Sequence, residues 1–128
     1  MSYYLAKTLP IAFDEAVTQV TAALKQEGFG VLSDIDVQAT LKMKLGVDTP
    51  KYRILGACNP GFAHEALKLE NKLGVLLPCN VIVREATARQ TEIAAIDPVS
   101  SMERVGNPKL AAVAEEVRAR LQRALDSL

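Results

Sequence analysis

The segment 53–83 constrains the fold more than any other part of this 128-residue chain. It reads RILGACNPGFAHEALKLENKLGVLLPCNVIV and contains both cysteines and the single histidine. Asn59-Pro60 is a typical helix start, because Asn accepts a hydrogen bond from a free amide and Pro costs nothing at the first helical position. We expect a strand over Tyr52–Cys58, a helix that ends near Gly74, and a strand over Cys79–Glu85. The segment therefore predicts a strand, a helix and a second strand in that order along the chain.

Patterns before and after this segment add further strands and helices. Three more apolar runs predict strands at 3–7, 30–35 and 91–96, and Asp97-Pro98 predicts a turn after the last of them. Apolar residues spaced by three and four predict three amphipathic helices. Their expected buried faces are Phe13, Ala16, Val17, Val20 and Leu24 before a stop at Gly28; Val37, Leu41 and Leu45 before a stop at Gly46; and, after Asn107-Pro108, Leu110, Val113, Val117, Leu121, Ala124 and Leu128.

These elements predict one α+β domain over residues 1–128. Early alternation of strands and helices, followed by a late hairpin, indicates a two-layer sandwich with a mixed sheet of about five strands and helices on one face. The other face of such a sheet needs cover. A second subunit supplies that cover, so we expect a homodimer.

Composition excludes several classes of partner. Lys plus Arg and Asp plus Glu number 15 each, and aromatic residues make up only 5%, which disfavours binding to nucleic acid. No apolar run approaches the roughly 20 residues of a transmembrane helix, and the first ten residues lack the apolar core of a signal peptide. We therefore expect a cytoplasmic protein without a membrane partner, whose cysteines are free thiols.

Five segments together resemble one known family. They are GFGVLSDIDVQATLKMKLG, YRILGACNP, FAHEAL, LGVLLPCNVIV and VGNP, and they span nearly the whole chain. On these segments the sequence resembles the bacterial and archaeal domain-of-unknown-function family 302. The resemblance implies a small α+β sandwich that self-associates. It implies no reaction and no cofactor.

The two thiols are the first candidates for chemistry. Cys58 precedes a helix N-terminus, where amides and the helix dipole stabilise a thiolate; alternatively, it packs as a small apolar residue. Cys79 begins an apolar strand, where packing is the simpler interpretation. Their 21-residue separation is neither a CxxC motif nor a zinc-knuckle spacing. The pair meets only if the two strands are neighbours.

His64 and Glu70 are candidates on the predicted helix. By helical geometry His64 lies opposite the buried face, either in solvent or at a groove, while Glu70 lies at the border of that face. A carboxylate there needs a partner, for which Arg53 or Arg84 is available, or it reaches solvent. His64 and Glu70 point about 120° apart on the wheel, so we expect no metal site from them and the cysteines.

A basic cluster suggests an anionic ligand. Lys42, Lys44, Lys51 and Arg53 fall within twelve residues, either as a solvated face or as the flank of an anion site. No GxGxxG or GxxxxGK[ST] loop accompanies them, so the sequence predicts no nucleotide cofactor.

Three functions follow from these residues. The first is a homodimeric protein that binds a small anionic or sulfur-containing molecule at Cys58, Asn59, His64, Glu70, Cys79 and Arg53. The second is a thiol or redox enzyme with Cys58 as nucleophile, His64 as acid and base, and Cys79 as resolving thiol. The third is a structural or regulatory interaction module in which the cysteines only pack.

Overall fold

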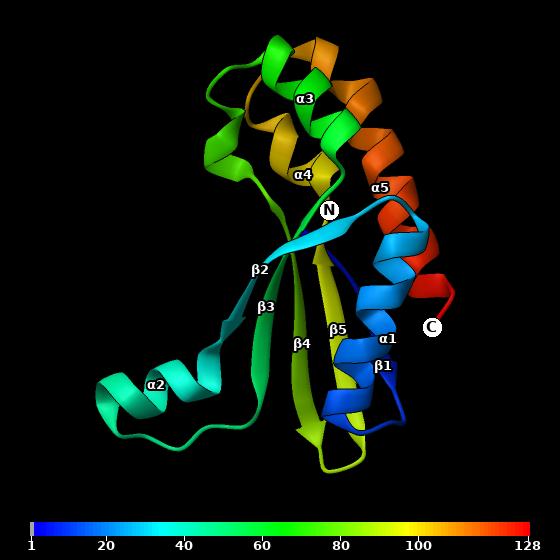
Figure 1. Ribbon diagram of the computed structural model, residues 1–128. Coiled ribbons are helices and arrows are strands. Elements are labelled where there is room, and N and C mark those ends of the chain that lie inside the picture. The colour runs from blue at the N-terminus through cyan, green and yellow to red at the C-terminus, as the bar shows by residue number, and fades with distance from the viewer. Residues whose placement is uncertain (1) are drawn as a thin grey trace.

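A five-stranded sheet organises the protein, as Figure 1 shows for the computed structural model, which describes residues 2–128. The strands are β1 (Tyr4–Leu9), β2 (Gly30–Asp36), β3 (Tyr52–Cys58), β4 (Cys79–Thr87) and β5 (Gln90–Ile96). The α-helices are α1 (Phe13–Gln26), α2 (Val37–Leu45), α3 (Pro60–Leu69), α4 (Pro98–Glu103) and α5 (Ala111–Asp126). Two short 3-10 helices, η1 (Leu73–Leu76) and η2 (Pro108–Leu110), complete the fold.

The sheet has the strand order β1-β5-β4-β3-β2, and every neighbouring pair is antiparallel. The α+β class, the five strands and the late hairpin are confirmed, whereas the expected mixed sheet is wrong. The strand–helix–strand pattern of β1, α1 and β2 suggested a parallel pair. These two strands do run in the same direction, but they form opposite edges of the sheet, with three strands between them.

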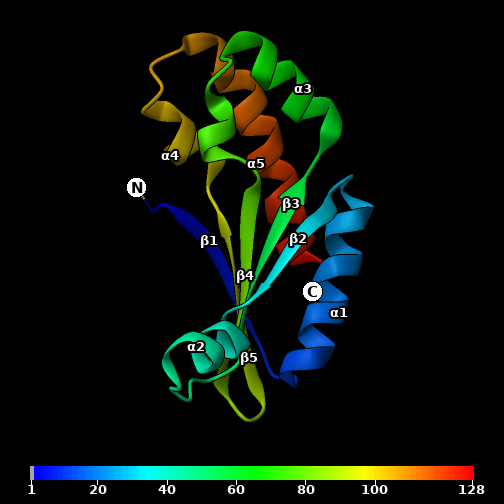
Figure 2. The same cartoon turned by 60° about the vertical axis from the view of Figure 1, so that its left-hand side comes forward.

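Helices α1 and α5 cover one face of the sheet, as expected (Figure 1). The predicted apolar faces of both helices pack there, because alternate strand residues point to that side. This main core includes Val20 of α1, Leu121 of α5, and Leu55, Val83 and Ile93 of the central strands, all at most 2% exposed. The opposite face carries no helix of residues 2–128 and stays open (Figure 2).

A second, smaller core lies beyond one end of the sheet. It joins α3, η1, α4, η2 and the start of α5 through Ala66, Leu73, Met102, Leu110 and Ala114. The structure corrects two predictions here. Helix α3 ends at Leu69 rather than near Gly74, and α4 begins directly after Asp97, where the sequence suggested only a turn.

Helix α2 differs most from the prediction. Its ends are as expected: the Asp36 carboxylate accepts a hydrogen bond from the Ala39 amide at 2.9 Å, and Gly46 ends the helix with φ of +68°. The predicted buried stripe is wrong, since α2 has no buried residue and Leu45 is 68% exposed. The spacing correctly indicated a helix, but α2 projects from the sheet edge as an arm that nothing else in residues 2–128 covers (Figure 1).

Within residues 2–128, every helix is too short or too polar to serve as a transmembrane span.

Candidate functional site

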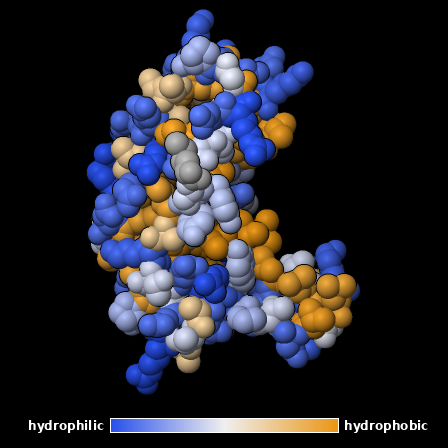
Figure 3. All heavy atoms as spheres, turned by 180° about the vertical axis from the view of Figure 1, so that it is seen from behind, coloured by the Kyte–Doolittle hydropathy of each residue, from blue (hydrophilic) through white to orange (hydrophobic). Residues whose placement is uncertain are grey.

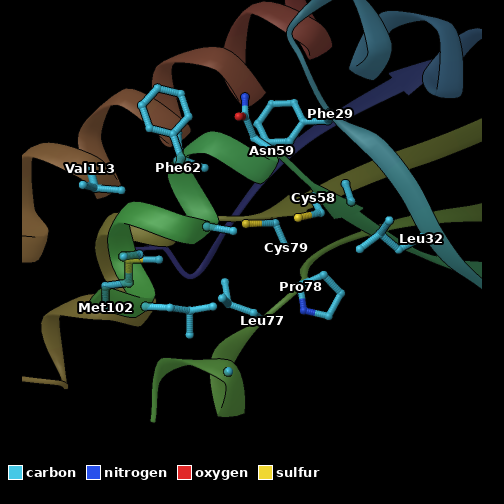
Figure 4. Close-up of a pocket in the computed structure, with 16 residues that line it drawn as sticks. Phe29, Leu32, Cys58, Asn59, Phe62, Leu77, Pro78, Cys79, Met102 and Val113 are labelled. Carbon is cyan, nitrogen blue, oxygen red and sulfur yellow. The ribbon is translucent and has the colours of Figure 1, made fainter. Parts of the chain in front are cut away.

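A pocket of about 320 Å³ lies between the two cores, beside the end of β3 and the start of β4 (Figure 4). Main-core residues form one wall and second-core residues the other. The lining consists of Phe29, Leu32, Ala57, Cys58, Asn59, Phe62, Ala63, Ala66, Leu67, Gly74, Leu77, Pro78, Cys79, Met102, Val113 and Val117. Ligand pockets of this size usually have such an apolar lining with a few polar groups.

Both cysteines line this pocket, which the sequence could not establish. Strands β3 and β4 are neighbours, and their register sets Ala57 opposite Cys79, so Cys58 is one residue away. Figure 4 shows both side chains at the pocket, and both are free thiols. Cys58 is partly exposed, whereas Cys79 is 8% exposed. Cys58 is therefore the thiol that solvent and reagents reach first.

Burial separates the chemistry of the two thiols. Burial, and to a smaller extent the nearby Cys58, raises the pKa of Cys79 from 9.0 to about 11. Cys79 therefore stays protonated at neutral pH and is a poor nucleophile. It contributes apolar, polarisable surface to the pocket.

Asn59 stands where β3 passes into α3, but it does not cap the helix as predicted. Its side-chain amide instead donates to the backbone carbonyl of Glu27 at 3.4 Å. The partner lies at the end of α1, where Gly28 has φ of +86° and the Phe29 amide donates to the Leu24 carbonyl at 2.9 Å. This ending confirms the predicted glycine stop and directs Phe29 into the pocket wall.

The pocket lining contains no charged residue. A cation lies close by, since the Arg120 guanidinium carbon is 5.2 Å from the centre of the Phe62 ring. The Arg120 side chain also donates to the Glu27 carbonyl and to the Glu116 carboxylate, at 3.3 Å and 3.1 Å. It is therefore occupied by protein groups. The lining favours an uncharged, apolar occupant.

His64, Glu70 and Arg53 lie outside the pocket lining. His64 is exposed on the outer surface of α3, as its helical position predicted. Glu70 follows the last turn of α3 and borders a separate surface hollow with Lys72 and Arg104. The structure does not bring these three residues together with the cysteines.

The arginines expected to pair with Glu70 have other partners. Arg53 donates to the Asp34 carboxylate on β2 at 2.8 Å, and Arg84 donates to Glu92 across β4 and β5 at 2.6 Å. The suggested pairing with Glu70 is therefore wrong. Each arginine pairs with a carboxylate of the neighbouring strand on its own face of the sheet, which lies closer to it than Glu70 does.

The basic cluster does not converge on one place. Lys42 pairs with Asp48 at 2.9 Å, while the Lys51 ammonium lies 5.8 Å from the centre of the Phe13 ring on the helical side of the sheet. Within residues 2–128, no group of three or more His, Cys, Asp or Glu side chains is arranged to hold a metal ion.

Sequence reasoning missed part of the pocket wall. Met102 belongs to α4, and the sequence predicts only a turn at the Asp97-Pro98 start of this helix. Asp97 followed by Pro was in fact the same helix-start signal as Asn59-Pro60. Phe29 and Phe62 also line the pocket, and nothing in their spacing along the sequence shows that they face a shared cavity.

Comparison with known proteins identifies the family. The domain of unknown function DUF302 matches residues 5–128. The chain belongs to the DUF302 family. A crystal structure of an uncharacterized conserved DUF302 protein from Bacillus stearothermophilus is similar, with a TM-score of 0.91, 29% identity and 98% of each chain covered. No curated protein matches the sequence. Membership of DUF302 confirms the resemblance found in the sequence and supplies no reaction.

Proposed function

We propose that this DUF302 protein binds a small, uncharged, apolar molecule in the pocket between its two cores. The observation that carries the proposal is the lining itself: apolar side chains around about 320 Å³, with Cys58 and Asn59 as polar groups beside them. A sulfur-containing or aromatic ligand suits two thiols, two phenyl rings and a thioether, because sulfur packs favourably against aromatic rings. An anionic ligand has no cation in the lining to pair with.

Position in the fold supports the same conclusion. The pocket opens where β3 and β4 meet the helices α3 and α4, so elements from distant parts of the sequence set its shape. Cavities between packed units are common ligand sites. Two free thiols agree with a reducing, cytoplasmic setting.

Native mass spectrometry combined with a fluorescent probe tests the proposal. We expect the untreated protein to carry a non-covalent adduct that is lost on denaturation, or to bind the neutral fluorophore N-phenylnaphthylamine with a single saturable site. Replacement of Ala63 by Phe fills the pocket from its partly exposed wall, and we expect it to weaken probe binding at least tenfold.

Ala112→Phe is the matched control. Ala112 is exposed on α5 and does not line the pocket, so the same added ring should leave binding unchanged. Equal binding by wild type and the Ala63→Phe protein would contradict the site. Absence of any adduct and of probe binding in the wild type would favour the structural interaction module.

A thiol redox protein is the second candidate, because Cys58 and Cys79 lie on paired strands at one pocket. The Cys58 thiolate would attack a small disulfide compound and release one thiolate from it. Cys79 would then resolve the mixed disulfide, releasing the second thiol and leaving a Cys58–Cys79 disulfide. Two features weaken this candidate: the raised pKa of Cys79 slows resolution, and His64 lies away from the pocket.

Mass spectrometry after mixing with oxidised glutathione separates the two candidates. A redox protein loses two hydrogens and forms the internal disulfide within minutes. A ligand-binding protein gives at most a slow mixed disulfide at Cys58, and Cys58→Ser retains probe binding.

A further inference from the structure

An apolar surface occupies the open face of the sheet, opposite α1 and α5. One row of side chains crosses all five strands in register: Ile35 pairs with Ile54, Ile54 with Ile82, Ile82 with Ala94, and Ala94 with Ala6. Strand residues in register on one face pack side by side. Open antiparallel faces are usually polar, so an uninterrupted apolar row marks an interaction surface.

Beside the apolar row, the charges of the open face balance. Its charged pair, Arg84 and Glu92, forms a cross-strand ion pair at 2.6 Å next to Thr8 and Tyr52. A surface that binds anionic lipid or nucleic acid needs an excess of cations, which this face lacks. The chemistry therefore favours another protein surface.

The α2 arm borders this face and carries apolar side chains of its own. Met43 is 81% exposed, and Leu45 and Val47 are 68% and 44% exposed. An isolated helix of nine residues is unstable in water unless an apolar face is covered. Figure 3 shows the arm as a separate apolar knob beside the hollowed surface of the molecule. The arm thus needs a partner as much as the sheet face does.

A hollow of about 440 Å³ on the same face matches such a knob. It is lined by the three tyrosines Tyr3, Tyr4 and Tyr52, by the apolar residues Ile82, Ala94, Ala95 and Ile96, and by the polar residues Asn80 and Glu92. Each copy of the chain therefore offers one apolar arm and one hollow lined by aromatic, aliphatic and a few polar side chains. In a dimer with twofold symmetry, the arm of each copy can enter the hollow of the other, because the same surface of both copies forms the interface.

We propose that the open sheet face and the α2 arm form the interface with a second copy of this chain. Five strands of about seven residues and a nine-residue helix present roughly 600 Å² in projection, and accessible area exceeds projected area. This agrees with the approximately 800 Å² per partner of a standard stable interface. The proposal does not depend on the pocket, because the pocket lining and the open face use different residues.

Sedimentation equilibrium of the full chain between about 1 and 100 µM tests the interface. We expect a mass twice the 13.8 kDa of one chain. Met43→Glu places a charge on the arm without touching the core, and Ile82→Lys places one in the middle of the apolar row. Each should raise the dimer dissociation constant at least tenfold while leaving the circular dichroism spectrum unchanged.

Val75→Glu is the matched control, since Val75 is 86% exposed on η1, outside both parts of the surface. It should remain as dimeric as the wild type. A monomeric wild type at 100 µM would overturn the proposal, and so would a dimer that both Met43→Glu and Ile82→Lys leave intact. A monomer that pellets with lipid vesicles or is captured by a different protein would assign the face to that partner instead.

Discussion

The Arg118 side chain donates a hydrogen bond through Nε to Asp97 Oδ2 at 3.0 Å, which joins α5 to the start of α4. The other carboxylate oxygen, Oδ1, accepts from the amides of Val99 and Ser100 at 3.0 Å and 3.4 Å. Asp97 is 4% exposed and follows directly on β5. A single buried carboxylate therefore fixes where α4 leaves the sheet, and with it the pocket wall formed by Met102.

Removal of this carboxylate should lower stability more than a surface ion pair does. Asp97→Ala loses the helix cap and leaves Arg118 without its partner, so we expect a loss of about 2–4 kcal/mol in the free energy of unfolding. Asp97→Asn keeps an oxygen for the cap and should lose about half as much. Urea unfolding monitored by circular dichroism measures both values.

Glu116→Gln is the control for that comparison. Glu116 pairs with Arg120 one turn along α5 at 3.1 Å, but both side chains are partly exposed to solvent. Such pairs contribute less than about 1 kcal/mol. If Asp97→Ala destabilised no more than Glu116→Gln, the carboxylate would not anchor α4.

Gly56 lies where three segments meet on the open face at the end of the sheet. A Cβ added there would lie 2.8 Å from Cγ of Pro78 and would overlap the Ser33 hydroxyl. Pro78 lines the pocket and Ser33 follows the lining residue Leu32, so a shift of either residue would disturb the pocket wall. We expect Gly56→Ala to destabilise by roughly 1–3 kcal/mol and to weaken probe binding.

Gly30→Ala is the matched comparison on β2. An added Cβ at Gly30 meets no atom within 4 Å, so the same change should shift stability by less than about 0.5 kcal/mol. Thermal melts of both variants at equal concentration decide the point. Similar melting temperatures for the two proteins would show that the approach of Ser33 and Pro78 to Gly56 is not tight.

Most elements of the fold could be predicted because each has a local signal. Gly28 correctly predicted the end of α1, and Asn107-Pro108 the start of the C-terminal helical segment. The apolar spacing of α1 and α5 correctly predicted which face of each helix is buried. Strand order has no local signal. The alternation of β1, α1 and β2 indicates direction only, so the separation of β1 from β2 by three strands could not be read from it.

The candidate site was predictable in part, for a related reason. Cys58 and Cys79 were noted individually by type and position, but their proximity depends on the pairing of β3 with β4. His64 was correctly placed away from the buried face by helical geometry alone. The apolar character of the pocket arises from residues of both cores, including Met102 of a helix that the sequence did not reveal. The expectation of an anionic ligand could therefore not be compared with the pocket lining from the sequence alone.

The buried thiol of Cys79 should make stability depend on pH in the alkaline range. Its pKa is about 11 in the folded chain and 9.0 ordinarily, so unfolding above pH 9 releases a proton that the folded protein keeps. The contribution is fully present below about pH 9 and is lost as the pH rises to 11. The loss amounts to roughly 2–3 kcal/mol.

Comparison with Cys79→Ala isolates this contribution, because all other titrating groups are shared. Under reducing conditions, the stability of the wild type relative to Cys79→Ala should fall steadily between pH 9 and 11 in urea unfolding experiments. Cys58→Ala should retain most of the wild-type slope, because burial is the larger cause of the raised pKa and the neighbouring thiol the smaller. Parallel pH profiles for the wild type and Cys79→Ala would mean that Cys79 ionises as readily in the folded protein as in the unfolded chain, which requires water in the pocket beside it.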